Sequence, residues 1–423
     1  MLAPVAPETT GRSTAGNAYR TYALVLLVVV YTFNFIDRQI LGVLAPAIKA
    51  DLRLTDTQLG LMGGLAFALF YTGLGVPIGW LADRWSRTWI MTLALTLWSV
   101  FTAACGLAGS FTQLFLCRMG VGFGEAGGVA PAYSLISDLF PAKARARALA
   151  VYSFGIPIGS ALGVLFGGLI ASHVNWRAAF VAVGLAGVVL APVFRLTIKE
   201  PPRLRTEVAI PMAAALRRLA RTPTFWLLSL GAASSSTVSY GLMFWLPSFF
   251  LRSFHLTLPQ VSFYFGGILL IGGLAGVWAG GWLADRLSGR SRRAYPLIPA
   301  AAFAATIPLA ITGAMAPSPA IGFFLFLIPQ ALGLMWLGPV LAAVQHMAPA
   351  RMRSTASSAF LFINNLIGIG CGTVLFGFLS DVLTKRFGAE ALRYSILSGL
   401  SLYLLSVMFL LLASRTIDKD WVD

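Results

Sequence analysis

Charged residues are scarce in this chain. Asp, Glu, Lys and Arg make up 11% of its 423 residues, whereas apolar residues make up 58%. A soluble domain usually carries about 25% charged residues, so this composition excludes a water-soluble globular protein. Cysteine is scarce too. The three cysteines lie inside apolar runs and show neither a CxxC metal spacing nor the pattern of a disulfide framework.

The common signatures of cofactor and metal chemistry are also missing. The sequence has no P-loop and no HExxH, and its three histidines are scattered. Residues 122–127 match GxGxxG formally, but they lie inside an apolar run with no strand before them, which excludes a dinucleotide site. We therefore expect no cofactor, no metal and no enzymatic activity. An intramembrane enzyme, the alternative of another class, would need a nucleophile paired with a base, and neither pairing is visible.

Long apolar runs dominate what is present. A helix needs about 20 apolar residues to cross the hydrocarbon core of a bilayer, which is about 30 Å thick. The runs predict twelve such helices, two of them in the longest run. They lie in 19–48, 57–82, 89–117 (whose last residues begin the next helix), 111–137, 148–176, 178–194, 222–251, 253–284, 294–350 (two helices), 354–380 and 394–414.

The longest polar stretch follows the sixth helix and divides the chain into six plus six. We predict a flexible cytoplasmic tail at 1–19, a six-helix bundle at 20–197, a basic linker at 198–221, a second six-helix bundle at 222–416 and a tail at 417–423. In the linker, 211–219 fits either a short helix on the membrane surface, with Arg217 and Arg218 at lipid headgroups, or a plain basic connection.

The basic balance of the chain follows from its loops. Lys and Arg number 31 against 15 Asp and Glu, a net charge of +16. With the amino terminus inside, 22 of these cations fall on the inner side and 7 on the outer side. The positive-inside rule then predicts a multi-pass protein of the bacterial inner (plasma) membrane with both termini cytoplasmic. Because this bias accounts for most of the charge, no nucleic-acid partner is expected.

An internal repeat relates the two halves. The string GWLADR at Gly79–Arg84 recurs at Gly281–Arg286, and at the same offset Leu54-Thr55 and Gln58 match Leu256-Thr257 and Gln260. Parallel repeats of this kind suggest a binding site between the halves, near the middle of the membrane.

The repeated GxLADR pattern, each copy followed by a basic turn, resembles the major facilitator superfamily of secondary transporters. The resemblance covers about residues 20–415. A narrower resemblance, to the Spinster family of sphingolipid and lysolipid transporters, rests on FIDRQ at 35–39, DTQLGL at 56–61 and RMGVGFGEA at 118–126. Anion:cation symporters of the same superfamily show similar patterns. The first copy of the loop motif ends in Trp-Ser-Arg, without the glycine found in the second.

The resemblance implies an all-α membrane fold of twelve transmembrane helices in two six-helix bundles. It also implies a gate on the inner side of the membrane, where Asp83 caps the eleventh helix and Arg84 or Arg87 completes a charge cluster. Asp285 and Arg286 are the matching pair of the second half. The alternative is that these charges only set the topology.

Four charges lie deep in the apolar runs: Asp37, Arg38, Arg118 and Glu125. Each costs roughly 2.5–3.5 kcal/mol to insert at the bilayer centre, which favours a functional role. We predict that Arg118 pairs alternately with Asp37 and Glu125, and that one carboxylate takes up a proton as the pairing changes. Arg38 lies about 100° around the helix from Asp37 and should not face the same partner. The alternative is a static buried ion pair joining two helices.

The second half carries no deep charge. Its polar candidates for substrate binding are Tyr240, Trp336, Asn364 and Asn365, which join Asn34, Arg38 and Arg118 of the first half. A cavity charged on one wall and apolar on the other suits an amphiphile with an anionic or zwitterionic head. We predict a monomeric, proton-coupled secondary transporter of a lysolipid or sphingolipid type of substrate. The alternative substrate is a small organic anion or drug.

Glycines recur every four residues in the fifth predicted helix, at Gly155, Gly159, Gly163 and Gly167. One face of glycines allows another helix to approach very closely. The face is either a passive packing surface or one on which helices bend and slide.

Overall fold

The computed structural model describes residues 16–82, 84–201, 212–288, 291–349 and 352–422, and within these ranges the chain is helical with no strand. The helices of the amino-terminal half are α1 (Asn17–Leu52), α2 (Asp56–Gly63), α3 (Leu65–Ala82), α4 (Arg87–Cys105), α5 (Phe111–Glu125), α6 (Val129–Leu139), α7 (Ala142–Ser153), α8 (Gly155–His173) and α9 (Trp176–Thr197).

The carboxyl-terminal half follows a short linker helix, α10 (Met212–Ala220), at the segment for which a surface helix was one of two expectations. Its helices are α11 (Pro223–Phe254), α12 (Leu258–Gly267), a π-helical turn at Ile268–Gly272, α13 (Gly273–Ser288), α14 (Ala294–Ala314), α15 (Pro319–Leu334), α16 (Leu337–His346), α17 (Arg353–Phe387), a 3₁₀ turn at Gly388–Glu390, α18 (Ala391–Gly399) and α19 (Ser401–Asp420).

Several pairs of successive helices form one membrane crossing with a short break. By length and hydropathy, the described part of the chain holds nine candidate spans. One of them, 355–420, runs through α17, α18 and α19 and therefore contains two crossings. Two further crossings fall outside these criteria: α5 with α6, which is interrupted at 126–128, and the serine-rich α11. The described helices thus make the twelve predicted crossings.

The two halves repeat each other in local detail. α1 and α11 both end in a left-handed residue, Arg53 at φ 52° and His255 at φ 53°. Such a conformation is uncommon outside glycine, so its recurrence at matching positions supports a true repeat. In both halves a capping box opens the next helix, where the Gln58 or Gln260 side chain accepts a hydrogen bond from the backbone N–H of a threonine.

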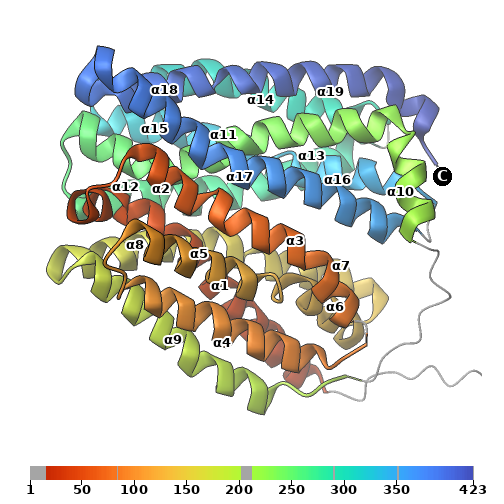
Figure 1. Cartoon of the computed structure of the whole chain (residues 1–423). Helices are drawn as coiled ribbons and strands as arrows, with labels where there is room; N and C mark the ends of the chain where they lie inside the picture. The colour runs from red at the N-terminus through yellow and green to blue at the C-terminus, as the bar shows by residue number, and fades with distance from the viewer. Residues whose placement is uncertain (1–15, 83, 202–211, 289–290, 350–351, 423) are drawn as a thin grey trace, which may run out of the picture.

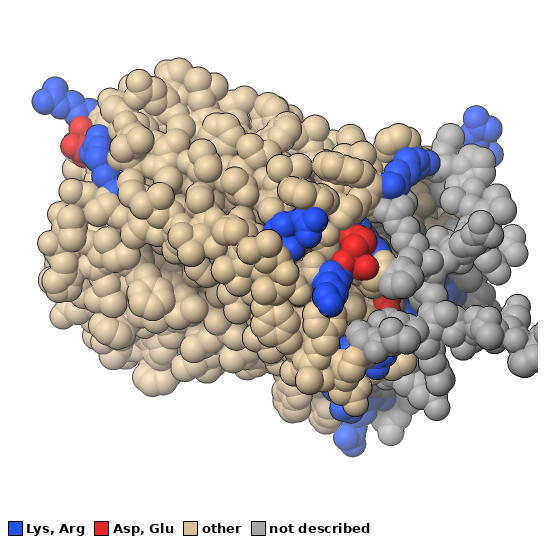
Figure 2. Space-filling view, turned by 90° about the horizontal axis from the view of Figure 1, so that it is seen from below, with Lys and Arg blue, Asp and Glu red and all other residues tan. Residues whose placement is uncertain are grey.

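The halves lie side by side, the amino-terminal half below the carboxyl-terminal half in Figure 1. The start of α1, the end of α9, α10 and the end of α19 share one end of the bundle, which we call the tail end. There the amide of Lys199 donates to the hydroxyl of Tyr19, at 2.7 Å. In Figure 2 the face in view has an almost uncharged band between its two ends, as expected of a surface that contacts lipid.

The glycine face of α8 packs tightly on α1. A methyl group added at Gly159 would lie 2.3 Å from the carbonyl oxygen of Thr32, and one at Gly163 would lie 2.8 Å from that of Ile36. No real side chain tolerates such distances without a shift of backbone. The close approach therefore requires glycine, whether the surface is static or slides.

Candidate substrate and proton site

A small cavity lies between the two halves. Its volume is about 40 Å³, room for about three water molecules and too little for a metabolite. The walls come from α1, α2, α3 and α5 on one side and from α11 and α17 on the other. The lining residues are Phe35, Arg38, Gln39, Gly63, Phe67, Arg118, Tyr240, Met243, Phe244, Ile369 and Thr373.

Arg38 forms more contacts than Arg118, the other charged residue that lines this cavity. Its Nε donates to Oε2 of Glu125 at 2.8 Å, and the Glu125 side chain is fully buried. The guanidinium also lies over three aromatic rings, 4.9 Å from the centroid of Phe35, 4.8 Å from Phe67 and 4.5 Å from Tyr71. An ion pair and cation–π contacts together make a buried arginine tolerable in an apolar setting.

Glu125 thus pairs with Arg38 in this structure, and not with Arg118 as expected. Arg118 instead donates from Nη1 to the backbone carbonyl of Asp37, at 3.3 Å. Helical side chains lean toward the start of their own helix, so Arg38 leans toward the tail end. α5 runs the other way, which places Glu125 nearer the tail end than Arg118, within reach of Arg38. Asp37 and Arg38 are separated by about 100° around α1, and they therefore contact different residues of α5. Arg38 contacts Glu125, and the carbonyl of Asp37 contacts Arg118.

Several polar atoms around this pair lack hydrogen-bond partners within the described chain. They are both amide atoms of Asn34, Oδ1 of Asp37, Oε1 of Glu125, Nη2 of Arg38 and Nε of Arg118. The amide of Asn34, a predicted substrate contact, forms no hydrogen bond with Asp37 or Arg38. Buried polar groups are nearly always satisfied, so this cluster has capacity for water, a proton or a polar part of a substrate.

The predicted residues of the carboxyl-terminal half are only partly brought to the cavity. Tyr240 lines it. Asn364 accepts a hydrogen bond from the Ser236 hydroxyl at 2.8 Å and donates one to Asn365 at 3.4 Å, away from the lining. Trp336 packs edge-on against Phe360, with ring centroids 6.0 Å apart.

Eight lining residues were not among the predicted substrate contacts, and they include Gln39, Phe67, Met243 and Phe244. Met243 and Phe244 follow Tyr240 by three and four residues, and such residues share one face of a helix. That spacing could have identified them. Gln39 and Phe67 carried no comparable signal, because their position depends on how α1 and α3 pack.

The end of the bundle opposite the tail end is closed by polar contacts between the halves. Arg252 of α11 donates to both oxygens of Asp56 at 2.7 and 2.8 Å, and Ser380 of α17 donates to one of them at 2.7 Å. Lys49 donates to the same carboxylate at 2.6 Å. Asp56 is only 1% exposed. These charges around the start of α2 therefore form a network centred on the buried Asp56, which sequence reasoning missed.

Asp381 of α17 completes this closure. Its carboxylate accepts from the backbone amides of Asp56 and Thr57 at 3.0 and 2.7 Å, and from the Thr57 hydroxyl at 2.6 Å. A carboxylate from one half thus caps the helix that begins in the other. The hydroxyl of Thr373 also donates to the carbonyl of Gly60, at 2.7 Å.

At the tail end, the contacts given for the described gating residues Arg84, Arg87 and Arg286 stay within their own halves. Arg87 binds Asp138 and, at 2.7 Å, Glu200, both in its own half. Arg84 lies over the ring of Trp80 at 3.9 Å, and Arg286 lies over that of Trp282 at 5.3 Å. Asp83 and the side chain of Asp285 lie outside the described residues. The hydrogen bonds and ion pairs that join described residues of the two halves at Asp56, Thr57 and Gly60 lie away from the tail end.

This architecture matches a known family. The model of the Major Facilitator Superfamily matches residues 27–373. The chain belongs to the major facilitator superfamily. It is 33% identical to an MFS-type efflux pump of Mycolicibacterium smegmatis over 427 residues, covering 100% of this chain and 99% of that protein. It is 30% identical to human protein spinster homolog 1, covering 86% of this chain and 74% of that protein.

Solved structures give the same result. A bacterial homolog of the human lysosomal transporter Spinster, in an inward-facing and unoccupied conformation, is 31% identical and superposes with a TM-score of 0.88 over 97% of this chain and 100% of that chain. Its inward-facing and occupied conformation gives a TM-score of 0.84, with the same identity and coverage. The predicted fold and the similarity to Spinster proteins are confirmed.

Proposed function

We propose that this protein is a proton-coupled secondary transporter that moves a lysolipid or sphingolipid type of amphiphile by alternating access. The observation that carries the proposal is the buried Arg38–Glu125 ion pair, whose member Arg38 lines a cavity between the halves, with Asp37 next to it. A static joint would place such a pair between helices of one solid core. Here one member, Arg38, lines the surface that a substrate would contact.

The proton step follows from the competition for Arg38. An anionic group of the substrate at Arg38 would weaken the bond from its Nε to Glu125. A carboxylate that loses its cationic partner in apolar surroundings takes up a proton more readily. Glu125 then holds the proton until the substrate leaves and Arg38 returns. Asp37, close to Arg118, is the second carboxylate available for this exchange.

The walls of the cavity support an amphiphilic substrate. Arg38 and Arg118 line its amino-terminal side, whereas Met243, Phe244 and Ile369 give the other side an apolar surface. Because about 40 Å³ holds no lipid, the site fills only after the halves separate further. The polar contacts at Asp56 and Asp381 close the end opposite the tail end, so we propose that substrate enters from the tail end in this state.

We place the tail end in the cytoplasm, with the protein acting as a monomer in the bacterial inner membrane. The distribution of Lys and Arg supports this orientation. The inward-facing state named for the similar solved structures supports it as well, since the opposite end of this protein is the closed one. Small organic anions or drugs are the second candidate substrates, which the full-length similarity to an efflux pump favours.

Reconstituted proteoliposomes test the coupling. Purified protein should move a fluorescent lysophospholipid faster when a pH gradient is imposed. Asp37→Asn or Glu125→Gln should abolish that acceleration. Asp418→Asn is the matched control, because Asp418 forms an exposed ion pair with Arg293 outside the site. Full proton-driven flux in both site variants would refute proton coupling at these residues.

A thermal-shift comparison decides between the substrate classes. Lysophospholipids, sugar acids and cationic drugs are each added to the wild type and to an Arg38→Met variant. Stabilisation by lysophospholipids alone, lost in the variant, supports the lipid proposal. Stabilisation by the small molecules alone, also lost in the variant, supports the second candidate.

A further inference from the structure

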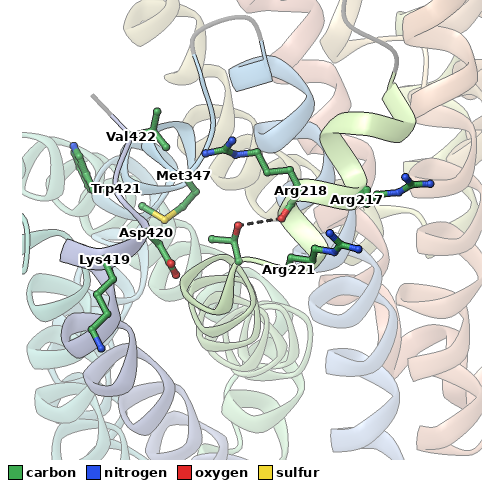
Figure 3. A pocket seen from close by; sticks show the side chains of 9 residues that line it. Arg217, Arg218, Arg221, Met347, Lys419, Asp420, Trp421 and Val422 are labelled. Carbon is green, nitrogen blue, oxygen red and sulfur yellow. Dashed lines mark hydrogen bonds between the residues drawn. The ribbon is translucent and has the colours of Figure 1, made fainter.

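A second and larger cavity opens at the tail end of the carboxyl-terminal half, with a volume of about 560 Å³ (Figure 3). α10 and the turn before α11 form one wall. The end of α19 and the two residues after it form the other wall. This cavity is remote from the site between the halves, and the proposed transport mechanism does not use it.

The wall made by the carboxyl-terminal residues is held in place. The ring of Trp421 stacks on His346 with centroids 4.3 Å apart and on Tyr295 at 5.4 Å. The amide of Val422 donates to the carbonyl of His346 at 2.7 Å. These contacts fix the end of the chain against α14 and α16, so the adjoining residues Lys419 and Asp420 have defined positions.

The opposite wall is equally constrained. The indole N–H of Trp226 donates to the carbonyl of Ala220 at 3.2 Å, and the Thr222 hydroxyl donates to that of Arg218 at 3.1 Å. Leu219 is 2% exposed and anchors α10 on its inner face. The turn between α10 and α11 thus presents its arginines from a fixed backbone.

Positive charge dominates the lining. Arg217, Arg218, Arg221 and Lys419 contribute four cations, and Asp420 is the one carboxylate among the described lining residues. Asp420 is already engaged, because it accepts from the amide of Thr224 at 3.0 Å. None of the four cations forms an ion pair with a carboxylate that the structure describes. In Figure 3 the Arg218 side chain extends toward Met347, while Arg217 points away from the opening.

From this geometry we infer that the cavity binds a phosphate-bearing anion. Guanidinium groups match phosphate oxygens in pairs, and several cations without a carboxylate partner in the described part of the chain favour a dianionic or polyanionic group at one cavity. A volume of about 560 Å³ lies in the range of small-molecule sites. The phosphate group could belong either to the headgroup of an acidic phospholipid or to a soluble phosphate compound.

The surroundings make a lipid headgroup accessible. Trp226, next to the α10–α11 turn, is 41% exposed, and tryptophan is enriched where a membrane meets water. Basic pockets between transmembrane helices on the cytoplasmic side are suited to anionic headgroups. A bound headgroup would join α10, α11 and α19, and so would stabilise the connection between the two halves.

Thermal unfolding of the full-length protein in a neutral detergent tests the inference. One arm adds phosphatidylglycerol, with phosphatidylcholine as the zwitterionic comparison. The other arm adds pyrophosphate, with chloride at equal ionic strength as the comparison. The variants are Arg218→Gln with Arg221→Gln, and Lys419→Gln alone. Arg147→Gln is the matched control, an exposed arginine of α7 at the tail end of the other half.

We expect phosphatidylglycerol or pyrophosphate to raise the melting temperature of the wild type and of Arg147→Gln. The double variant should need at least about tenfold more of the same anion. A response to phosphatidylglycerol alone identifies a lipid headgroup, and a response to pyrophosphate identifies a soluble phosphate compound. The inference is overturned when neither anion stabilises the wild type, or when both variants respond as the wild type does. Should the double variant not fold, Lys419→Gln supplies the comparison, with a weakening of several-fold expected.

Discussion

Arg252 and Asp56 form a two-pronged ion pair that joins the two halves at the end opposite the tail end. Both guanidinium Nη atoms donate to the carboxylate, at 2.7 and 2.8 Å. Asp56 opens α2, and Arg252 lies in the last turn of α11, so a helix start in one half is held by a helix end in the other. The proposed alternating access requires this pair to break when the transporter opens on that side.

Loss of this ion pair should shift the protein toward the state that is open at that end. Arg252→Gln leaves Asp56 with Lys49 and Ser380, while Asp56→Asn removes the charge on which the network centres. Arg252 is partly exposed, so we expect about 1–2 kcal/mol, or about 5–30-fold in the ratio of the states. Spin labels at positions 51 and 385, in a background without the native cysteines, report the distance across the closure.

The control for this experiment is Glu390→Gln, which breaks an ion pair with Arg393 at the same end but within one half. The label distances should not change in that variant. An unchanged distance distribution in both Arg252→Gln and Asp56→Asn would show that the pair does not hold this end closed.

Arg38 and Glu125 should be strongly coupled in stability. Arg38→Met leaves a buried carboxylate without its partner, and Glu125→Gln leaves a buried guanidinium, each at a cost of about 3–5 kcal/mol. The double variant removes both charges and should cost clearly less than the two single changes together. Melting of all four proteins in detergent gives the coupling energy. Additive losses would mean that the ion pair is not formed in the protein as purified.

An exposed pair supplies the comparison. Arg293→Met with Asp418→Asn should show a coupling below about 1 kcal/mol, because water screens both groups. A similar coupling energy for both pairs would mean that burial does not strengthen the Arg38–Glu125 ion pair.

The crossings could be predicted because hydropathy is a local property. Runs of about 20 apolar residues identify a span wherever it packs, and the repeat of GWLADR gives the relation between the halves. The partners of the buried charges depend instead on tertiary geometry. The depths of the buried charges in the membrane suggested that Asp37 and Glu125 share Arg118, whereas the opposite directions of α1 and α5 bring Arg38 to Glu125.

The closure around Asp56 was missed for a related reason. In the sequence, Asp56 follows Lys49 closely and begins a helix, as an ordinary exposed charge near a loop would. Sequence alone does not show that α17 covers it. Two signals were present. Asp56 begins the DTQLGL segment on which the Spinster resemblance partly rests, and Arg252 stands just before the Leu256-Thr257 copy of the same turn. Read together, they place an acid and a base at equivalent ends of the two repeats.

Glu200 should make stability depend on pH at the acid side. Partial burial disfavours its charge, but hydrogen bonds from the Thr88 amide, Arg87 and Ser86 outweigh this and hold the pKa of Glu200 below its ordinary value of 4.5. A lowered folded-state pKa means that the stabilisation is present above pH 4.5 and is lost as the pH falls through the lowered value. Glu200→Gln should therefore have a lower melting temperature than the wild type at pH 7.

The gap in melting temperature between wild type and Glu200→Gln should shrink as the buffer is made more acidic than pH 4.5. In an Arg87→Gln background the same substitution should have a much smaller effect, because Arg87 is the cation that favours the ionised form. A gap that stays constant from pH 7 into the acid range would exclude ionised Glu200 as its source.

Gly159→Ala should distinguish a static glycine face from a sliding one. The new methyl group would meet the carbonyl oxygen of Thr32 at 2.3 Å, so α8 must move away from α1, at a cost of about 1–3 kcal/mol. Gly73→Ala is the matched control, since a methyl group there meets nothing within 4 Å. If the face only packs, transport per folded molecule should persist while the melting temperature falls. If the helices slide on it, transport per folded molecule should fall as well. An unchanged melting temperature together with full transport would contradict the tight packing itself.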